Sequence, residues 1–296
     1  MIVTNIISSI IALVAIITLC WQFYSNKQQK FEDKFFELLK IHRQNVNEMK
    51  IGTLEKRVVF KELFYELCNC QIFIEKIFED FKNKYYRTDE NKEQHDFYYN
   101  FGRKEKLNLA FQLFFYGSEF NHIFKIIYPN ENIQQTEKLV IEDKIKEKIR
   151  EQNEKWKQGN FSIVEIVTDN EDNNFSFYKP YCGHSEWLGH YFRHLYHTVK
   201  FIDKECLCFS KKYEYLKILK AQLSEYEQAI LFYHACSDLG SAWFKKGKNS
   251  FIVKYRLIQN LPLLIVFGEN HGEVERKLSD LGLSKEEVKE YFKWEQ

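Results

Sequence analysis

The chain begins with a long apolar run. From Ile2 to Tyr24 no side chain is charged, and the only amides, Asn5 and Gln22, lie near the two ends of the run. Because a helix rises about 1.5 Å per residue, a run of this length can cross a hydrocarbon core of roughly 30 Å. The pattern predicts a transmembrane helix within residues 1–25, which contacts the lipid bilayer through residues 2–24.

The residues at the end of the run predict its orientation. Aromatic side chains close the run and lysines follow it: Trp21, Phe23, Tyr24, Lys27, Lys30 and Lys34. Aromatic rings favour the membrane interface, and lysines mark its cytoplasmic side. We expect a single-pass protein of the inner (cytoplasmic) membrane, with its N-terminus outside and its C-terminal body in the cytoplasm. A cleaved signal peptide is the alternative, but no basic segment precedes the run and no small-x-small site lies near Cys20 to Asn26.

Apolar residues at helical spacing dominate the next part of the chain. The first segment contains Phe31, Phe35, Leu38, Leu39 and Val46. The second, from Leu54 to about Lys84, contains Val58, Phe60, Phe64, Leu67, Phe73 and Ile77. The third runs from Leu107 to Phe115 and is closed by Gly117, and the fourth, within the charged stretch 130–158, contains Ile141, Ile145 and Ile149. Residues three or four positions apart share one face of a helix, so these segments predict four helices. The first continues directly from the membrane, and the polar residues 85–105 predict a loop.

A change of layer is predicted near the middle of the chain. Phe161 to Val167 is the best strand candidate, although its alternation is poor. Residues 169–174 are rich in turn formers and predict a hinge, after which a second helical layer begins near Tyr178.

The whole pattern predicts an all-α, helix-dominated fold. Only three prolines and eleven glycines occur in 296 residues, so few positions interrupt helices. Ser284 and Glu287 have the spacing of a capping box that opens a short last helix. We expect an N-terminal transmembrane helix followed by a cytoplasmic helical domain over residues 26–296, with sub-layers at 26–168 and 176–296.

The stretch from Gly183 to Lys200 is the best candidate for chemistry, because four of the nine histidines fall within it. On a helix that advances about 100° per residue, one face is apolar and carries Leu188, Phe192, Leu195, Val199 and Ile202. The opposite face, named here the histidine face, carries His190, Arg193, His194 and His197. We expect the apolar face to pack into the core and the histidine face to meet solvent or another chain.

Three interpretations of the histidine face stay open. An ordinary solvated surface needs only polar residues. A metal site would use His190 and His194, one turn apart, with His197 as a third ligand, but three imidazoles on one straight helix rarely converge on a tetrahedral ion. A phosphate or RNA site would use Arg193 as a fixed charge and the histidines as donors or acid-base groups. Arg193 and His197 are one residue too close for the R-x4-6-H pattern of helical ribonuclease toxins. We predict no bound metal and no cofactor.

A carboxylate on the next predicted helix needs a partner. That helix, from about Lys212 to Cys236, has an apolar face made by Leu216, Leu219, Leu223, Tyr226 and Ile230. Glu227 lies close to this face, and an unpaired buried charge costs several kcal/mol. We therefore predict an ion pair with Arg193 on the preceding helix, at roughly 4 Å, which is either structural or catalytic.

Composition and missing motifs exclude several classes of function. Lys and Arg number 43 and Asp and Glu 42, so the formal charge of +1 creates no overall field that attracts nucleic acid. The chain has no G-x-x-x-x-G-K-[ST] loop, no G-x-G-x-x-G motif and no G-x-S-x-G elbow. The seven cysteines include two C-x-C pairs but no zinc-ribbon spacing, and they predict reduced thiols in the cytoplasm. Cys182 beside His184 lacks the third group that a thiol nucleophile needs.

Two segments of the C-terminal half carry a distinctive motif. The first is Gly183-His184 followed by residues 188–196, and the second is residues 221–227 continuing to 230–233. Together they resemble the phage abortive infection proteins of the AbiC-like family, and residues 35–39 with His42 and residues 114–117 resemble weaker motifs of that family. The resemblance spans about residues 31–264. The matching positions are Gly183, His190, Tyr191, Arg193, Tyr196, Ser224, Tyr226 and Glu227.

The resemblance implies a role in stopping phage propagation, often at the expense of the infected cell, and it supplies no agreed catalytic residue. We expect a membrane-anchored antiviral defence protein that acts by abortive infection, triggered by a phage or host component, through assembly with other copies or membrane disturbance. The alternative is a membrane-tethered ribonuclease-like toxin. Its candidate catalytic residues are His190, Arg193, His194, His197 and Glu227. A membrane scaffold outside defence is disfavoured by the resemblance, and the residues leave enzymatic activity and nucleic-acid binding open.

Overall fold

The protein is described by a computed structural model that covers residues 2–84, 102–117, 135–158, 179–205, 207–245 and 247–258, together with residues 279, 284, 286 and 287. Within these residues helices dominate, and the strands form one two-stranded hairpin, which confirms the all-α prediction. The elements in chain order are α1 (Ile2–Glu48), β1 (Lys50–Ile51), β2 (Leu54–Glu55), α2 (Val58–Lys84), α4 (Arg103–Tyr116), α6 (Gln135–Lys157), α7 (Ser185–Lys204), α8 (Phe209–Lys220), α9 (Glu225–Cys236), η1 (Asp238–Trp243), η2 (Gly247–Asn249) and α10 (Phe251–Tyr255).

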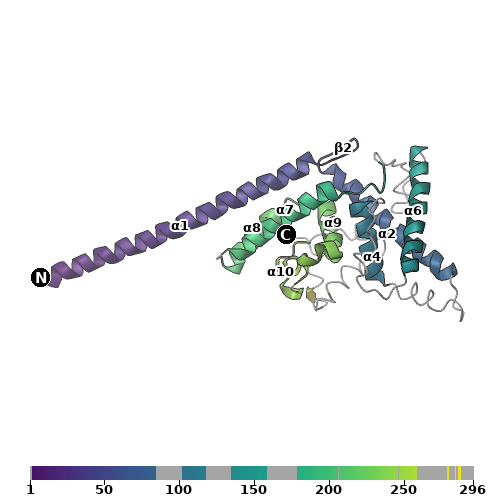
Figure 1. The fold of residues 1–296 in the computed structure, drawn as a ribbon. Coiled ribbons are helices and arrows are strands. Elements are labelled where there is room, and N and C mark those ends of the chain that lie inside the picture. The colour runs from purple at the N-terminus through teal and green to yellow at the C-terminus, as the bar shows by residue number, and fades with distance from the viewer. Residues whose placement is uncertain are drawn as a thin grey trace.

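Helix α1 is continuous over 47 residues, and its two halves differ in environment. Its N-terminal half projects away from the body of the molecule, while its C-terminal half lies along α7 and α8 (Figure 1). The apolar side chains of the projecting half are exposed, whereas Phe31, Phe35, Leu39 and Val46 are buried. The prediction of an amphipathic helix that continues from the apolar run is therefore confirmed. By length and composition α1 is a candidate membrane span.

The second predicted helix begins later than expected. Instead of opening a helix at Leu54, the chain forms an antiparallel hairpin in which Lys50 pairs with Glu55 and Ile51 with Leu54. Gly52 has a φ of 58°, in the left-handed region that a turn between two strands requires. Helix α2 starts after this hairpin, and its other predicted core residues are buried or half-buried, but Val58 is exposed.

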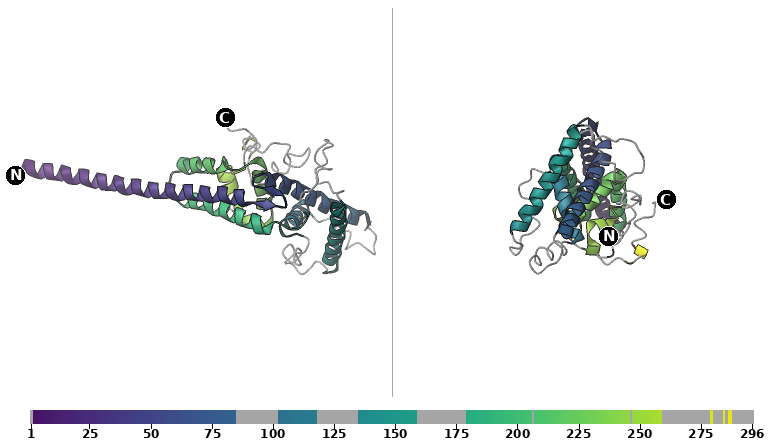
Figure 2. Two further views of the ribbon diagram at one scale, coloured as in Figure 1. Left: turned by 90° about the horizontal axis from the view of Figure 1, so that it is seen from above. Right: turned by 90° about the vertical axis from the view of Figure 1, so that its right-hand side faces the viewer.

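Helices α4 and α6 agree with their sequence patterns. Gly117 ends α4 with a φ of 80°, and its backbone N–H donates to the Leu113 carbonyl. Ile141, Ile145 and Ile149 are buried on α6, which packs against α2 at the end of the body farthest from the N-terminus (Figure 2). The strand candidate at 161–167, the hinge at 169–174 and residues 85–101 of the predicted loop lie outside the described residues. The end of that loop prediction is wrong, because α4 begins at Arg103.

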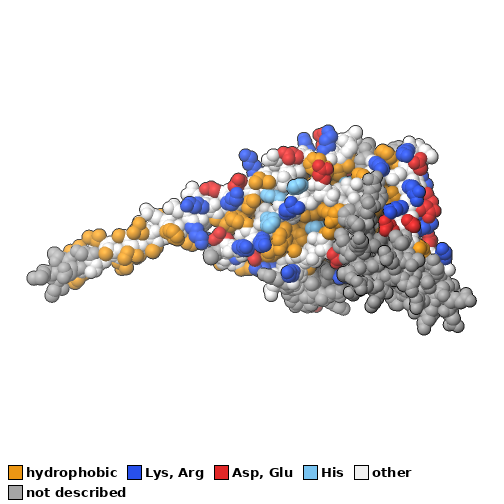
Figure 3. All heavy atoms as spheres, in the orientation of Figure 1, with side chains coloured by type: hydrophobic (Ala, Val, Ile, Leu, Met, Phe, Trp, Pro, Cys, Tyr) orange, Lys and Arg blue, Asp and Glu red, His pale blue; other side chains and the backbone are white. Residues whose placement is uncertain are grey.

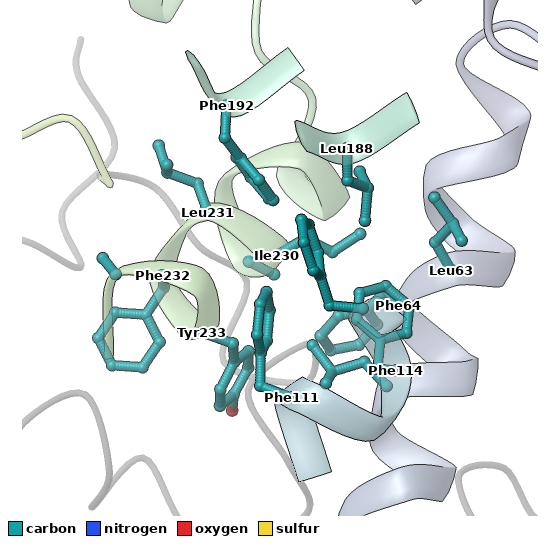
Figure 4. Packing of buried hydrophobic residues seen from close by; sticks show 14 of the residues in the cluster. Leu63, Phe64, Phe111, Phe114, Leu188, Phe192, Ile230, Leu231, Phe232 and Tyr233 are labelled. Carbon is teal, nitrogen blue, oxygen red and sulfur yellow. The ribbon is translucent and has the colours of Figure 1, made fainter. Parts of the chain in front are cut away.

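The centre of the core lies where α2, α4, α7 and α9 meet. Figure 4 shows apolar side chains from these four helices packed at this point: Leu63, Phe64, Phe111, Phe114, Leu188, Phe192, Ile230, Leu231, Phe232 and Tyr233. The four consecutive residues of α9 lie on different sides of that helix, so α9 is buried all round. Burying each such side chain stabilises the fold by about 1.5–3 kcal/mol. All five residues of the predicted apolar face of α7 are buried. This helix is therefore fixed in rotation about its axis, which determines where the histidine face lies.

The prediction of one helix from Lys212 to Cys236 is wrong. Helix α8 ends at Lys220, and α9 begins at Glu225 after a turn. Ser224 caps α9: the Glu227 backbone N–H donates to Ser224 Oγ (3.3 Å), and the Ser224 backbone N–H donates to Glu227 Oε2 (2.7 Å). This is a complete capping box, and it satisfies N–H groups that a helix start leaves without partners. The capping box predicted at Ser284 and Glu287 is confirmed by the same pair of hydrogen bonds, at 2.7 and 3.2 Å.

Candidate functional site

The start of α7 is held by a close crossing of two backbones. Gly183 has a φ of 85°, and a Cβ atom there would lie 2.6 Å from the Tyr116 carbonyl oxygen. A Cβ atom at Gly117 would lie 2.6 Å from the Cys182 carbonyl oxygen. Side chains essentially never fit at such distances, so glycine is required at both positions. The glycine that opens the family-like motif therefore has a structural role.

His184 belongs to a buried polar pair. Its Nε2 lies 2.9 Å from Glu66 Oε2, and the exposed fractions of the two side chains are 2% and 1%. The other carboxylate oxygen, Oε1, accepts a hydrogen bond from the Tyr181 backbone N–H (2.8 Å). The His184 backbone N–H donates to the Phe115 carbonyl at 2.8 Å. This arrangement ties α7 to α2 and α4, and it leaves His184 no access to a ligand.

Glu227 has partners other than the predicted one. Its Oε2 lies 3.3 Å from Arg57 Nε, and its Oε1 accepts a hydrogen bond from the Tyr191 hydroxyl at 3.1 Å. Arg57 also donates from Nη2 to the Gln222 carbonyl (2.7 Å), so it connects the turn before α2 to the turn before α9. The predicted Arg193–Glu227 ion pair is wrong. Glu227 is fully buried on α9 and meets the inward-facing Tyr191 of α7, whereas Arg193 is exposed on the same helix α7.

The histidine face divides into an exposed part and a packed part. His190, Arg193 and His197 are exposed, as predicted. His194 is half-buried, and its Nε2 lies 3.0 Å from the Leu38 carbonyl oxygen of α1. Burial lowers the pKa of His194, against the opposing effect of this hydrogen bond. Figure 3 shows histidine side chains beside Lys and Arg on the surface over α7. We name His190, Arg193 and His197 the exposed α7 triplet.

A hollow of about 320 Å³ lies beside this triplet. It is formed by α4, α7, α9 and η1 and lined mainly by aromatic and small residues: Phe115, Tyr116, Gly189, Phe192, Arg193, Tyr196, His234, Leu239, Gly240, Ala242 and Trp243. Tyr196 and Trp243 meet edge to face with ring centres 5.1 Å apart. Arg193 provides the positive charge of this lining. The hollow can therefore receive a flat or apolar group that carries a negative charge.

His234 is the polar side chain in the lining that the sequence did not suggest. Its ring stacks on Phe192 at a centroid distance of 3.9 Å, and its Nδ1 has no hydrogen-bond partner among the described residues. Burial lowers the pKa of His234 to about 3, so the ring is neutral at physiological pH. The sequence contains a signal for the buried position of His234, because this residue lies four positions after Ile230 and so falls on the predicted apolar face of its helix.

No metal centre emerges in the part of the chain that the structure describes, where no three His, Cys, Asp or Glu side chains converge on a common point. His190 and His194, the two possible zinc ligands one turn apart, also lie in different environments. His190 is exposed, whereas His194 contacts α1. A larger hollow, of about 830 Å³, lies between α2 and α6. Its lining includes six Asp, Glu, Lys and Arg residues of both signs and lies outside the family-like motif, so it is a weaker candidate.

Comparison with known proteins links one segment of this chain to a family model. Residues 183–264 match the family model described as "putative phage abortive infection protein". A search of curated proteins and a search of solved structures each found no match. The matched segment contains both C-terminal motifs, whereas the weaker resemblances near residues 35–42 and 114–117 lie outside it. Every residue that lines the hollow beside α7, except Phe115 and Tyr116, comes from the matched segment.

The motif positions fall into two groups. Gly183, Tyr191, Ser224 and Glu227 hold α7 and α9 in place through the contacts described above. Tyr226 is half-buried, with its hydroxyl oxygen 3.5 Å from that of Tyr65. His190, Arg193 and Tyr196 instead reach the surface or the hollow. Only this second group is placed to meet another molecule.

Proposed function

We propose that the protein is a membrane-tethered effector of phage defence that acts by abortive infection. Residues 2–24 cross the inner membrane, and the helical body lies in the cytoplasm. Two features of this chain carry the proposal: a segment that matches the abortive infection family model, and a helix whose apolar half is not covered by any of the residues that the structure describes.

The membrane part of the proposal is supported by the exposure of α1. Ile11 and Leu19 are 63% and 64% exposed, and the other large apolar side chains described in this half are exposed as well. Apolar surface of this extent is unfavourable in water, and a bilayer removes that cost. Lys27, Lys30 and Lys34 follow the run and support an orientation with the body inside.

The exposed α7 triplet and the neighbouring hollow are the surface through which we expect the infection signal to act. The buried motif residues satisfy one another and hold the fold. Arg193 is the exposed cation of the motif, and no described residue forms an ion pair with it. A phage or host component with a negatively charged group would find its partner here, and assembly with other copies or membrane disturbance would follow.

A ribonuclease-like activity is the second candidate. It is favoured by the positions of His190, Arg193 and His197, which are exposed within two turns of one helix beside a hollow. Such a set can bind phosphate and move protons. Incubation of the purified protein with RNA tests this alternative: cleavage that is lost in both Arg193→Ala and His197→Ala would favour it over an effector without chemistry.

Phage plaquing on cells that express the protein tests the main proposal. The wild type should reduce plaque formation, and Arg193→Ala and His190→Ala should restore it while leaving expression unchanged. Lys157→Ala on α6 is the control, because it removes an exposed cation outside the matched segment and outside both hollows. A chain with Lys substituted at Ile10, Leu13 and Ile17 should lose both membrane fractionation and protection. Full protection by all of these variants would contradict the proposal.

A further inference from the structure

The body of the protein packs against α1 directly beside the end of the proposed membrane span. Lys27 Nζ lies 3.4 Å from Glu205 Oε1, and Lys211 Nζ lies 6.0 Å from the centre of the Tyr24 ring. Glu205 and Lys211 stand on either side of the turn between α7 and α8. Since Tyr24 is the last residue of the apolar run, this turn lies at the level where the run leaves the bilayer.

The turn exposes apolar surface at this level. Phe209, the first residue of α8, is 55% exposed, and Cys208 beside it is exposed as well. The Phe209 ring is held in place, because it stacks on Tyr213 and Tyr255 with ring centres 6.1 and 6.0 Å apart. A supported aromatic ring that faces outward is suited to the interface between water and hydrocarbon.

Positive charge surrounds this apolar surface. The nearby carboxylates are engaged: Glu205 with Lys27, Asp203 with Lys254 (2.6 Å), and Glu32 with the Tyr215 hydroxyl (2.8 Å). Lys30, Lys204 and Lys211 are exposed, and none of them forms a salt bridge within the described residues. Exposed lysines close to a bilayer are attracted to anionic lipid headgroups.

We propose that the α7–α8 turn, meaning Lys204 with residues 207–212, is a second membrane contact. Phe209 enters the interface, and Lys30, Lys204 and Lys211 bind the headgroups of anionic phospholipids. The proposal rests on the membrane span of the preceding subsection. Because α7 packs along α1, contact at both places fixes the tilt of the body and the height of the exposed α7 triplet above the bilayer.

Photocrosslinking from position 209 tests the contact in the full-length protein. Phe209→p-benzoylphenylalanine is compared with Phe36→p-benzoylphenylalanine, because both phenylalanines are 55% exposed. Phe36 lies twelve residues beyond Tyr24, or about 18 Å farther from the bilayer. The proteins are reconstituted in vesicles of phosphatidylcholine and phosphatidylglycerol in equal parts, and integration is measured by resistance to carbonate extraction.

We expect lipid adducts at 209 and none at 36. Adducts at neither position in carbonate-resistant protein would overturn the contact and leave the span intact, whereas carbonate-extractable protein would overturn both. Adducts at both positions would show that exposure alone explains them and would overturn the contact as well.

A charge reversal tests the headgroup part of the proposal. Lys211→Glu should lower the yield of adducts at 209 about threefold in the anionic vesicles and leave it unchanged in pure phosphatidylcholine. Lys157→Glu, on α6 at the opposite end of the body, is the control and should change neither yield (Figure 1). Equal yields for Lys211→Glu and the wild type in anionic vesicles would overturn the role of the lysines.

Discussion

Two buried carboxylates, Glu66 and Glu227, join α7 and α9 to the rest of the body in different ways. Both side chains are at most 1% exposed. Glu66 meets the imidazole of His184, which is equally buried and 118 residues away along the chain. Glu227 takes part in a capping box with Ser224 and meets Arg57, whose side chain is 54% exposed.

The difference shows how a buried acid depends on its partners. The partners of Glu66 are brought together by the tertiary structure. They are buried, so water cannot take the place of the Glu66 carboxylate as their hydrogen-bond acceptor. Glu227 has one local partner, one buried partner in Tyr191 and one cation that water reaches. Loss of Glu66 therefore removes the acceptor of two buried groups, the His184 ring and the Tyr181 N–H, whereas loss of Glu227 removes that of one fully buried group, the Tyr191 hydroxyl.

Glu66→Ala should have the largest effect on stability. It leaves His184 Nε2 and the Tyr181 N–H buried without their acceptor, and we expect a loss of about 3–5 kcal/mol in the free energy of unfolding. Urea unfolding of the detergent-solubilised protein measures it. His184→Ala is the partner variant for a double-mutant cycle, in which the two losses should be far from additive. Additive losses would mean that the pair is not an energetic unit.

Glu227→Ala should cost less, about 2–3 kcal/mol. The capping box contributes about 1 kcal/mol and the buried Tyr191 hydroxyl loses its acceptor, while the exposed Arg57 can return to water. Glu227→Gln keeps an oxygen for the Ser224 N–H and should recover about half of the loss. A larger loss for Glu227→Ala than for Glu66→Ala in the same urea experiment would break the comparison.

Acidification should act on the Glu227 region through His42. The ring of His42 is 5.5 Å from that of Tyr191, and neither ring nitrogen has a partner among the described residues. Burial, with smaller effects of His194, Arg57 and Arg43, lowers its pKa to about 4. Because this value is below that of an unfolded histidine, the unfolded state binds the proton first as the pH falls, and folding is weakened.

From pH 7 to pH 5 this single group should remove about 2 kcal/mol of stability. His42→Phe replaces the buried ring by one that does not titrate, so its unfolding free energy should fall less over the same range. Urea unfolding at several pH values measures both proteins. The matched control is His190→Phe, because His190 is exposed and its replacement should leave the slope as in the wild type. Equal slopes for His42→Phe and the wild type would contradict the prediction.

Arg57→Ala should have the smallest effect. Its side chain is more than half exposed, so the ion pair with Glu227 is screened by solvent. Glu227 keeps the hydrogen bonds from the Tyr191 hydroxyl and the Ser224 N–H, which hold its buried charge, so we expect a loss of about 1 kcal/mol. Thermal unfolding at low and high salt measures it, and the wild type should approach the variant as salt increases. A loss as large as that of Glu227→Ala would show that Arg57 behaves as a buried partner.

Local patterns determined the elements that the sequence predicted well. The apolar faces of α1, α6 and α7 follow from spacing within one helix, and the capping box at Ser284 follows from four adjacent positions. The same four-residue signal at Ser224 and Glu227 is obscured by apolar spacing that continues through the turn. Leu216, Leu219, Leu223 and Ile230 are all buried, although the helix breaks between them. A continuous apolar face can therefore span two helices that pack on the same core.

The sequence by itself determined the membrane-length apolar run, the helical class and the exposure of His190, Arg193 and His197, because each of these depends on residues close together in the chain. Only the tertiary structure decided which charges meet. Glu227 pairs with Arg57 rather than Arg193 because the core fixes the rotation of α7, turning Tyr191 inward toward Glu227 and Arg193 outward to the hollow. Helix periodicity gives the relative positions of side chains on one helix, but the direction of each face is set by packing with elements more than a hundred residues away.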